Sequence, residues 1–226
     1  MTATGPFETG CLLRLIEDRL APGAAVLPPL RAVDRVIYVF RGEIRSGQVR
    51  VPEDEAHYSR AAMPVAAGDE GAVVWRFELV REGSGEGLAS GTGVESRPLL
   101  SAPLTTIDPA GDWLMRCDSV AFPPGGQALL HTHAGPGIRC VQQGGIRIDA
   151  GGASHHHGLG EPWFEDGPTP VFAQADDVPT RFVRVSILPA NYLGRSSIRY
   201  EREEDRDRPK DQTYRGYVDE PLRRRD

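Results

Sequence analysis

Two histidines with one residue between them, His131 and His133, are the strongest candidates for chemistry in this sequence. Side chains on a β-strand alternate between its two faces, so both imidazoles would point to the same side of a strand at this position. A pair of imidazoles on one face can bind a divalent metal ion. The alternative is that the two histidines form hydrogen bonds inside a polar pocket without a metal. These two residues alone leave both interpretations open.

A catalytic metal centre usually takes three protein ligands and keeps one position open. Glu165 is the best third candidate, because it lies two residues after Trp163 and would share its strand face if Phe164 points the other way. Gln142 could also face the pocket. A set of two histidines and one carboxylate suits Fe2+ or Mn2+, and Zn2+ is also compatible. Glu165 could instead act as a catalytic general base.

Other residues able to do chemistry have a more ordinary expected role. The histidines at 155–157 follow a glycine-rich turn, and we expect an exposed hairpin that binds metal only adventitiously. Cys140 could present a thiol to the pocket, but a small buried hydrophobic side chain is the more common role of cysteine. Arg139 and Arg184 could bind a substrate carboxylate, although pairing with acidic strand neighbours is the expected role.

The segments that must position these residues are short and rich in β-forming side chains. The apolar runs Val36–Phe40, Ala72–Trp75 and Phe182–Leu188 are brief, and 26 glycines and 19 prolines punctuate the chain. This pattern favours many short strands joined by tight turns over helices. The sequence therefore predicts an all-β fold.

The chain also repeats itself weakly. Residues 35–44 resemble residues 138–147, since each is a β-rich run closed by a glycine turn, and residues 75–79 resemble residues 183–187. Two features that recur in the same order at similar offsets predict a duplicated all-β unit of about 100 residues. The alternative is that any two strand–turn–strand segments look alike.

A change of composition suggests where one domain ends and the next begins. Residues 82–93 are rich in Gly, Ser and Glu and indicate a flexible linker or a long loop. We expect an N-terminal domain with its linker at residues 1–95 and a C-terminal domain with the candidate site at 96–195. A charged tail is expected at 196–226.

The spacing around the two histidines resembles the first motif of the cupin superfamily, G-x5-H-x-H-x(3,4)-E-x6-G. Gly125, His131, His133 and Gly145 fall in register with it, and Ile138 stands where the family has a ligand glutamate. The resemblance covers roughly residues 11 to 190 and implies a jelly-roll barrel around the two histidines.

The second cupin motif, G-x5-P-x-G-x2-H-x3-N, matches only at Gly160. In that alignment Val171 takes the place of the ligand histidine. With Ile138 and Val171 at two ligand positions, the pocket would be less polar than a full ligand set, which suits an apolar ligand.

The N-terminal half fits the spacing of the first motif without its chemistry. Gly23, Pro29, Arg31, Arg35 and Gly42 match the spacing, but neither histidine nor glutamate is present. The resemblance therefore implies a bicupin, with two cupin-type double-stranded β-helix (jelly-roll) barrels in tandem and a degenerate first barrel. It also implies a homodimer.

Charge and motifs exclude several other classes. A formal charge of −6 disfavours nucleic-acid binding. Three widely spaced cysteines argue against a disulfide framework or a zinc ribbon. We see no membrane span and no leader in Met1–Gly10, so we expect a cytoplasmic protein. Nucleophile-elbow serine, P-loop and dinucleotide-binding motifs are absent from the sequence.

Two functions follow from this reading. The first is a metal-dependent enzyme that acts on a small organic molecule in the C-terminal barrel, with His131, His133 and Glu165 around the metal; oxygenase, isomerase and lyase reactions are all compatible. The second is a metal-free cupin that binds or senses a small molecule without catalysis. A purely structural role in an oligomer is a third possibility.

Overall fold

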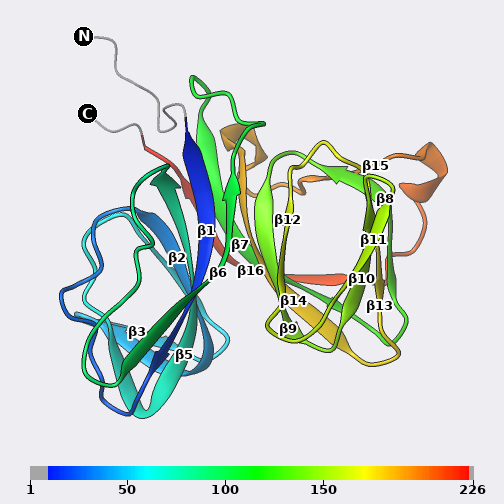
Figure 1. Ribbon diagram of the computed structural model, residues 1–226. Helices are drawn as coiled ribbons and strands as arrows, with labels where there is room; N and C mark the ends of the chain where they lie inside the picture. Colours follow the sequence, from blue (N-terminus) through cyan, green and yellow to red (C-terminus); the bar gives the residue numbers. More distant parts are fainter. Residues whose placement is uncertain (1–9, 224–226) are drawn as a thin grey trace. The chain divides into compact units, whose positions relative to one another are not determined.

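The computed structural model describes residues 10–223, and the chain forms two compact units that divide between Pro103 and Leu104. The regular elements of these residues are β-strands and two short 3-10 helices (Figure 1), which confirms the all-β prediction. No helix within residues 10–223 is long and apolar enough to cross a membrane. The expectation of no leader at residues 1–9 lies outside the described residues.

The N-terminal unit is built from one antiparallel sheet of six strands. Its order is β3-β2-β5-β1-β6, with β4 also paired to β2. The strands are β1 (Cys11–Leu20), β2 (Asp34–Ser46), β3 (Val49–Pro52), β4 (Ala56–Ser59), β5 (Ala66–Arg81) and β6 (Val94–Pro103).

The C-terminal unit contains two sheets of five strands, in the orders β12-β9-β14-β7-β16 and β11-β10-β13-β8-β15. In Figure 1 these strands curve around a common interior. The elements are β7 (Trp113–Phe122), β8 (Gln127–His133), β9 (Gly137–Gln143), β10 (Ile146–Ala150), β11 (Ala153–His157), β12 (Pro162–Glu165), β13 (Val171–Ala175), β14 (Thr180–Pro189), η1 (Ala190–Tyr192), β15 (Ile198–Tyr200), η2 (Glu203–Asp205) and β16 (Thr213–Pro221).

The core of the C-terminal unit lies between its two sheets. β13 shows why, because Val171, Ala173 and Ala175 are buried while the residues between them are partly exposed. This period of two is expected for a strand with one face on the core. From the other sheet, Phe122 and Phe182 pack into the same apolar cluster. The cluster fills one part of the interior, and the polar residues described below occupy the rest.

The two units share a pairing order. In the N-terminal unit β4, β2, β5, β1 and β6 pair in that sequence, and in the C-terminal unit β12, β9, β14, β7 and β16 pair in the same way. An internal duplication would produce such a correspondence. The C-terminal unit adds a separate second sheet, whereas the described N-terminal strands remain connected in one sheet.

Two segments differ from the expectations for domain ends. β6 continues to Pro103 and pairs with β1, so the division of the chain lies beyond residue 95. Residues 196–223, expected as a charged tail, contain β15, which pairs with β8, and β16, which pairs with β7. The residues before β16 are mostly charged, so the composition of this region does not indicate a strand. The last three residues of that tail lie outside the described residues.

An ionic cluster is buried inside the N-terminal unit. Glu78 accepts hydrogen bonds from Arg14 at 2.5 and 3.0 Å, from Arg35 at 3.0 Å and from Arg76 at 2.7 Å. Arg76 also donates to Asp18 at 2.7 and 3.2 Å. All five side chains are more than nine-tenths buried. Since isolated buried charges are costly, each guanidinium depends on its carboxylate partner.

The glycine-rich segment 82–93 completes this cluster instead of linking two domains. It connects β5 to β6 within the N-terminal unit. The carbonyl of Gly85 accepts a hydrogen bond from Arg14 at 2.6 Å, and that of Gly87 accepts one from Arg76 at 3.1 Å. A Cβ at residue 87 would collide with the Arg14 guanidinium, so the close approach of the backbone needs glycine there.

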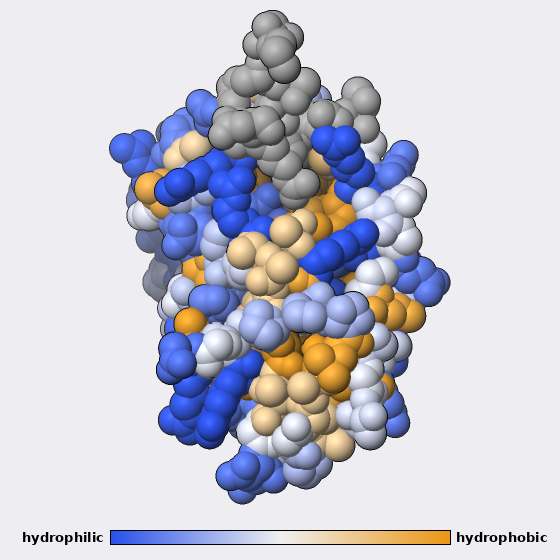
Figure 2. All heavy atoms as spheres, turned by 90° about the vertical axis from the view of Figure 1, so that its left-hand side faces the viewer, coloured by the Kyte–Doolittle hydropathy of each residue, from blue (hydrophilic) through white to orange (hydrophobic). Residues whose placement is uncertain are grey.

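The surface of this unit mixes polar and apolar side chains. Figure 2 shows hydrophilic residues along the margins of a less polar central strip. The large apolar side chains exposed on this unit are Leu27, Val49 and Leu88. They are few and lie on separate segments, as on most globular surfaces.

We predict that Glu78→Gln lowers the free energy of unfolding by about 3–5 kcal/mol, because three buried guanidiniums lose their shared carboxylate. Equilibrium urea unfolding measures the change. The matched control is Glu70→Gln on the exposed part of the same strand, expected within about 0.5 kcal/mol of wild type. Equal effects of the two substitutions would contradict the role given to the cluster.

Candidate functional site

Four strands bring the polar residues of the C-terminal interior together. β8 carries the two histidines, β9 carries Arg139, β12 carries Glu165 and β14 carries Arg184. Arg139 lies opposite both Trp163 and Arg184, and Arg184 lies opposite Asp118 on β7. Directly opposed residues share a sheet face. The pairing therefore builds a row of charged side chains along the inner face of one sheet.

The two histidines face the interior side by side, as their spacing predicts. Their Nε2 atoms are 3.2 Å apart, and the rings meet edge to face at a centroid distance of 4.7 Å. Nδ1 of His131 lies 2.6 Å from the carbonyl oxygen of Leu129. We assign the proton of neutral His131 to Nδ1 from this contact, which leaves a lone pair on Nε2.

Glu165 lies next to these imidazoles, so the structure brings the three predicted ligands together. Its Oε2 is 3.2 Å from Nε2 of His133. Its Oε1 accepts a hydrogen bond from the indole of Trp163 at 2.8 Å. This bond shows that Trp163 and Glu165 share a strand face. The three predicted ligands form a chain with His133 in the middle.

Arg139 pairs with an acidic side chain of a neighbouring strand, which is the role expected from the sequence. Its Nη2 lies 2.6 Å from Oε2 of Glu165, and its side chain is 1% exposed. Nη1 donates to the carbonyl of Gly137 at 2.6 Å. The contact is a close ion pair without the alignment of a hydrogen bond. Oε2 of Glu165 also lies 3.2 Å from Nε2 of His133.

Burial and charge fix the protonation states of the site. Burial lowers the pKa of His133 to about 3 and also lowers the pKa of His131, so both imidazoles are neutral at pH 7. Burial alone would raise the pKa of Glu165, but Arg139 and the nearby His133 hold it well below its usual range. Burial lowers the pKa of Arg139 to about 10, which leaves the guanidinium charged.

A second charge pair, between Arg184 and Asp118, lies at the end of this row of charged side chains. Arg184 donates to both oxygens of Asp118, at 2.6 and 3.0 Å. Burial would lower the pKa of Arg184, but the Asp118 carboxylate raises it. The inner face thus holds two cations and two anions, and their charges balance.

The donor set suits a divalent metal in type but not in arrangement. Two neutral imidazoles and a carboxylate are proper ligands for Fe2+, Mn2+ or Zn2+. However, the Arg139 guanidinium already neutralises Glu165, and Glu165 contacts only one of the two imidazoles. Within residues 10–223, no group of three or more His, Cys, Asp or Glu is arranged to hold a metal ion. A metal would need Glu165 to leave its arginine.

The motif alignment predicts that the wrong face of β9 lines the pocket. Ile138 was expected at a ligand position facing the pocket, and Cys140 and Gln142 share its strand parity. The structure turns Arg139 to the cavity instead, while Ile138 is fully buried and does not line the cavity. Gly137 begins the strand, and the alternation of side chains fixes the rest. Strand parity counted from Gly137 could have identified Arg139.

Two further expectations concern Val171 and the histidine cluster. Val171 lines the cavity, as its aligned position implies. His155 and His156 on β11 are exposed, and His156 lies 3.0 Å from Asp176. His157 stacks on Trp163 at a centroid distance of 4.9 Å. His155 and His156 therefore lie outside the site, while His157 packs against Trp163, which lines the cavity.

The cavity beside the site is almost filled. Its volume is about 20 Å3, enough for roughly one water molecule. Gln212 and Tyr214, from the C-terminal segment, help to close it. Sequence reasoning did not place these two residues at the site. A ligand larger than water must therefore extend beyond this cavity.

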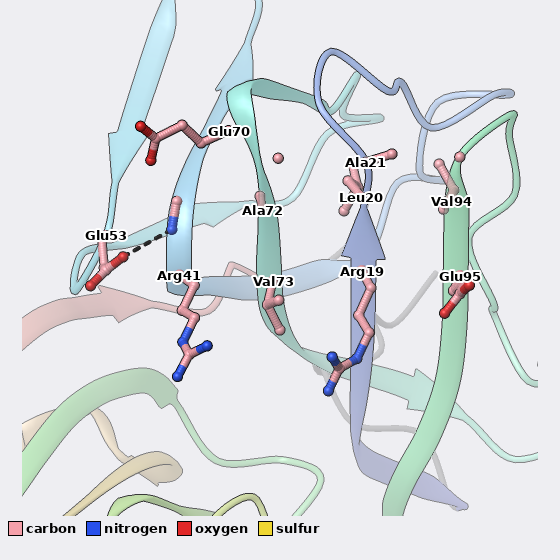
Figure 3. A pocket seen from close by; sticks show the side chains of 13 residues that line it. Arg19, Leu20, Ala21, Arg41, Glu53, Glu70, Ala72, Val73, Val94 and Glu95 are labelled. Carbon is pink, nitrogen blue, oxygen red and sulfur yellow. Dashed lines mark hydrogen bonds between the residues drawn. The ribbon is translucent and has the colours of Figure 1, made fainter.

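A larger hollow lies elsewhere, on the N-terminal unit. It has a volume of about 780 Å3 and is widely open. In Figure 3, Arg19 and Arg41 point to the same side, flanking Val73, while Glu53 bonds to the backbone of a neighbouring strand. The lining carries Glu53, Glu70 and Glu95 as well as the two arginines. None of the predicted site residues line it, so its size does not make it the chemical centre.

Comparison with known proteins supports the fold. No family model matches the sequence, and no curated protein matches it. Solved structures that match include AerE from Microcystis aeruginosa, with 13% identity and a TM-score of 0.54 over 80% of this chain and 88% of that one. Oxalate decarboxylase from Bacillus subtilis, described as having Mn(II) centres, matches with 13% identity and a TM-score of 0.60 over 83% and 71%.

Coconut allergen cocosin is a third match, with 8% identity and a TM-score of 0.56 over 78% of this chain and 77% of that chain. Likeness at such low identity concerns the fold. The matches show that this chain shares its fold with these proteins.

We predict that stability falls as the pH drops from about 7.5 to 5, partly through His133. Its folded pKa, about 3, lies below the unfolded value of 6.5, so the unfolded state binds more protons in this window. His133 therefore contributes fully above pH 6.5 and loses this contribution as the pH falls toward 3. His133→Asn should flatten the dependence measured by urea unfolding, whereas His155→Asn, at an exposed position, should not. An unchanged slope in His133→Asn would contradict the burial of a neutral imidazole.

Proposed function

We propose that the C-terminal unit binds a small organic molecule at the polar centre formed by His131, His133, Arg139 and Glu165, and that this centre works without a metal ion. The observation that carries the proposal is the buried ion pair between Arg139 and Glu165. The guanidinium supplies the positive charge that a metal supplies in a metal-dependent cupin. The carboxylate is thereby stabilised in the interior without an ion.

Electrostatics supports this assignment. Two unit charges at 4 Å interact by about 4 kcal/mol at the effective dielectric constant typical of proteins, so a divalent ion at that distance from Arg139 would meet a repulsion of about 8 kcal/mol. Glu165 offers one negative charge, and Arg139 already neutralises it. The remaining two ligands, His131 and His133, are neutral at pH 7.

The site retains binding capacity for a polar ligand. Nη2 of Arg139 and Oε2 of Glu165 are buried against each other without an aligned hydrogen bond. Unsatisfied buried donors and acceptors are costly and favour a ligand or water that completes them. A ligand that places a hydroxyl or carboxyl group there would gain these bonds. The chemistry assigned to the centre is therefore recognition, with no covalent step.

A metal-dependent enzyme is the second candidate, favoured by one observation. The Nε2 atoms of the histidines are 3.2 Å apart, and Nδ1 of His131 is anchored on a backbone carbonyl, as metal-ligating histidines usually are. In this candidate His131, His133 and Glu165 would hold Fe2+, Mn2+ or Zn2+, which would act as a Lewis acid in an oxygenase, isomerase or lyase reaction. It requires Glu165 to separate from Arg139.

Several finer expectations belong to the same proposal. We propose that the shared pairing order of the two units reflects duplication, and that the N-terminal unit is a reduced barrel whose site is replaced by the ionic cluster around Glu78. The homodimer and the cytoplasmic location stay predictions.

The two candidates differ in how Arg139 variants respond to metal. We predict that Arg139→Met is destabilised, because Glu165 loses its cation, and that Mn2+ or Zn2+ restores stability by binding the unmasked carboxylate and imidazoles. At a metal concentration of about one hundred times the dissociation constant the gain is about 2.7 kcal/mol. Thermal unfolding with and without metal measures it.

Two controls accompany this variant. Arg139→Lys keeps the positive charge and should gain no stability from metal, and Arg139→Met combined with His133→Ala should lose the response. Elemental analysis of untagged wild-type protein decides the main question directly. Stoichiometric metal that disappears in His131→Ala with His133→Ala would overturn the metal-free proposal and establish the second candidate.

A further inference from the structure

A second hollow on the C-terminal unit adjoins the small cavity at the site. It has a volume of about 510 Å3, within the range of pockets for small ligands. It lies between β16, β7 and the segment 194–198. Arg184, Ile198 and Tyr214 line both this pocket and the inner cavity. The pocket is thus the space into which a ligand at the polar centre would extend.

The pocket carries an excess of positive charge. Arg116, Arg184 and Arg195 line it, against Asp118 and Asp219. Arg116 pairs with Asp219 at 2.9 and 3.1 Å, and Arg184 pairs with Asp118 at 2.6 and 3.0 Å. Arg195 forms no ion pair or side-chain hydrogen bond to any residue in the range 10–223. One guanidinium of the pocket therefore remains uncompensated.

Arg184 and Gln212, two buried residues next to the pocket, also have polar atoms without a hydrogen bond. Arg184 uses Nε and Nη2 on Asp118, and its Nη1 bonds to no described residue. Gln212, which is 6% exposed, directs Nε2 to the hydroxyls of Tyr200 and Tyr214, at 3.4 and 3.1 Å. Its Oε1 has no partner. Whichever way the amide is turned, one polar atom stays unbonded beside the pocket.

Tyr214 gives the pocket a flat apolar wall. Its side chain is 51% exposed, which is unusual for a large aromatic residue that also lines a buried cavity. The guanidinium carbon of Arg184 lies 5.8 Å from the centre of its ring. Opposite Asp118, Gly216 contributes no side chain, and a Cβ there would meet no atom within 4 Å. The wall thus faces open space next to the arginines.

We propose that this pocket binds a small planar carboxylate, with its ring on Tyr214 and its carboxylate on Arg195 and on Nη1 of Arg184. The inference rests on the proposed binding function and names its ligand class. A guanidinium recognises a carboxylate through two parallel hydrogen bonds, and a cationic wall beside an aromatic ring suits an aromatic acid. One uncompensated cation matches a monoanion better than a phosphate.

Benzoate and its neutral isostere benzamide test the charge requirement. In buffer with EDTA, isothermal titration of the full chain should show benzoate binding at least about tenfold tighter than benzamide. Arg195→Gln should weaken benzoate by about fivefold to tenfold, and Tyr214→Ala should weaken both compounds. Arg199→Gln is the matched control, because Arg199 is exposed on β15 next to Ile198 and does not line the pocket.

The outcomes separate this inference from the proposed function. Equal affinities for benzoate and benzamide, equal effects of Arg195→Gln and Arg199→Gln, or no benzoate binding at about 10 mM would each overturn the carboxylate pocket. Benzoate binding that appears only when Mn2+ replaces EDTA would support the pocket and overturn the metal-free centre. Stabilisation of EDTA-treated protein by neutral compounds alone would support the centre and overturn the pocket.

Discussion

The contact between Arg139 and Glu165 is the interaction on which the interior of the C-terminal unit depends. A carboxylate and a guanidinium lie together where water is almost excluded, and neither charge would be tolerated there alone. The presence of this pair decides the other properties of the site. It keeps Glu165 ionised and neutralises its charge, while burial keeps the adjacent imidazoles neutral. The cavity therefore has the ligand types of a metal centre, but its carboxylate is already neutralised.

The C-terminal segment separates this interior from a larger adjoining pocket. Gln212 and Tyr214 narrow the cavity, and the same tyrosine forms a wall of the adjoining pocket. Sheet pairing holds these residues in place, because β16 adds to the edge of β7. One wall of the pocket is therefore formed by a strand that lies outside the motifs resembling cupins.

Much of the fold could be predicted from the sequence, since short apolar runs between glycines and prolines leave few alternatives to strands. The meeting of His131, His133 and Glu165 was also predictable, because alternation along a strand is a local rule. The pairing of Arg139 with an acidic strand neighbour was expected, but its place on the cavity face was not, because the motif assigned the opposite face of β9 to the pocket. Segment 82–93 was predicted to be a flexible linker or a long loop, and it is a loop within the N-terminal unit. Its composition is that of a linker, but its backbone carbonyls bond to buried arginines that are distant in sequence.

The row of charges across β7, β14, β9 and β12 also restricts how these strands can assemble. A strand that slips by two residues keeps every apolar side chain on its proper face, so the hydrophobic pattern alone tolerates the error. The same slip moves Arg184 about 6–7 Å along the strand from Asp118 and leaves two buried charges without partners. Misaligned versions of the sheet are therefore destabilised even when their cores are intact. The charged side chains that pair in the site thus also favour the correct strand register over a register shifted by two residues.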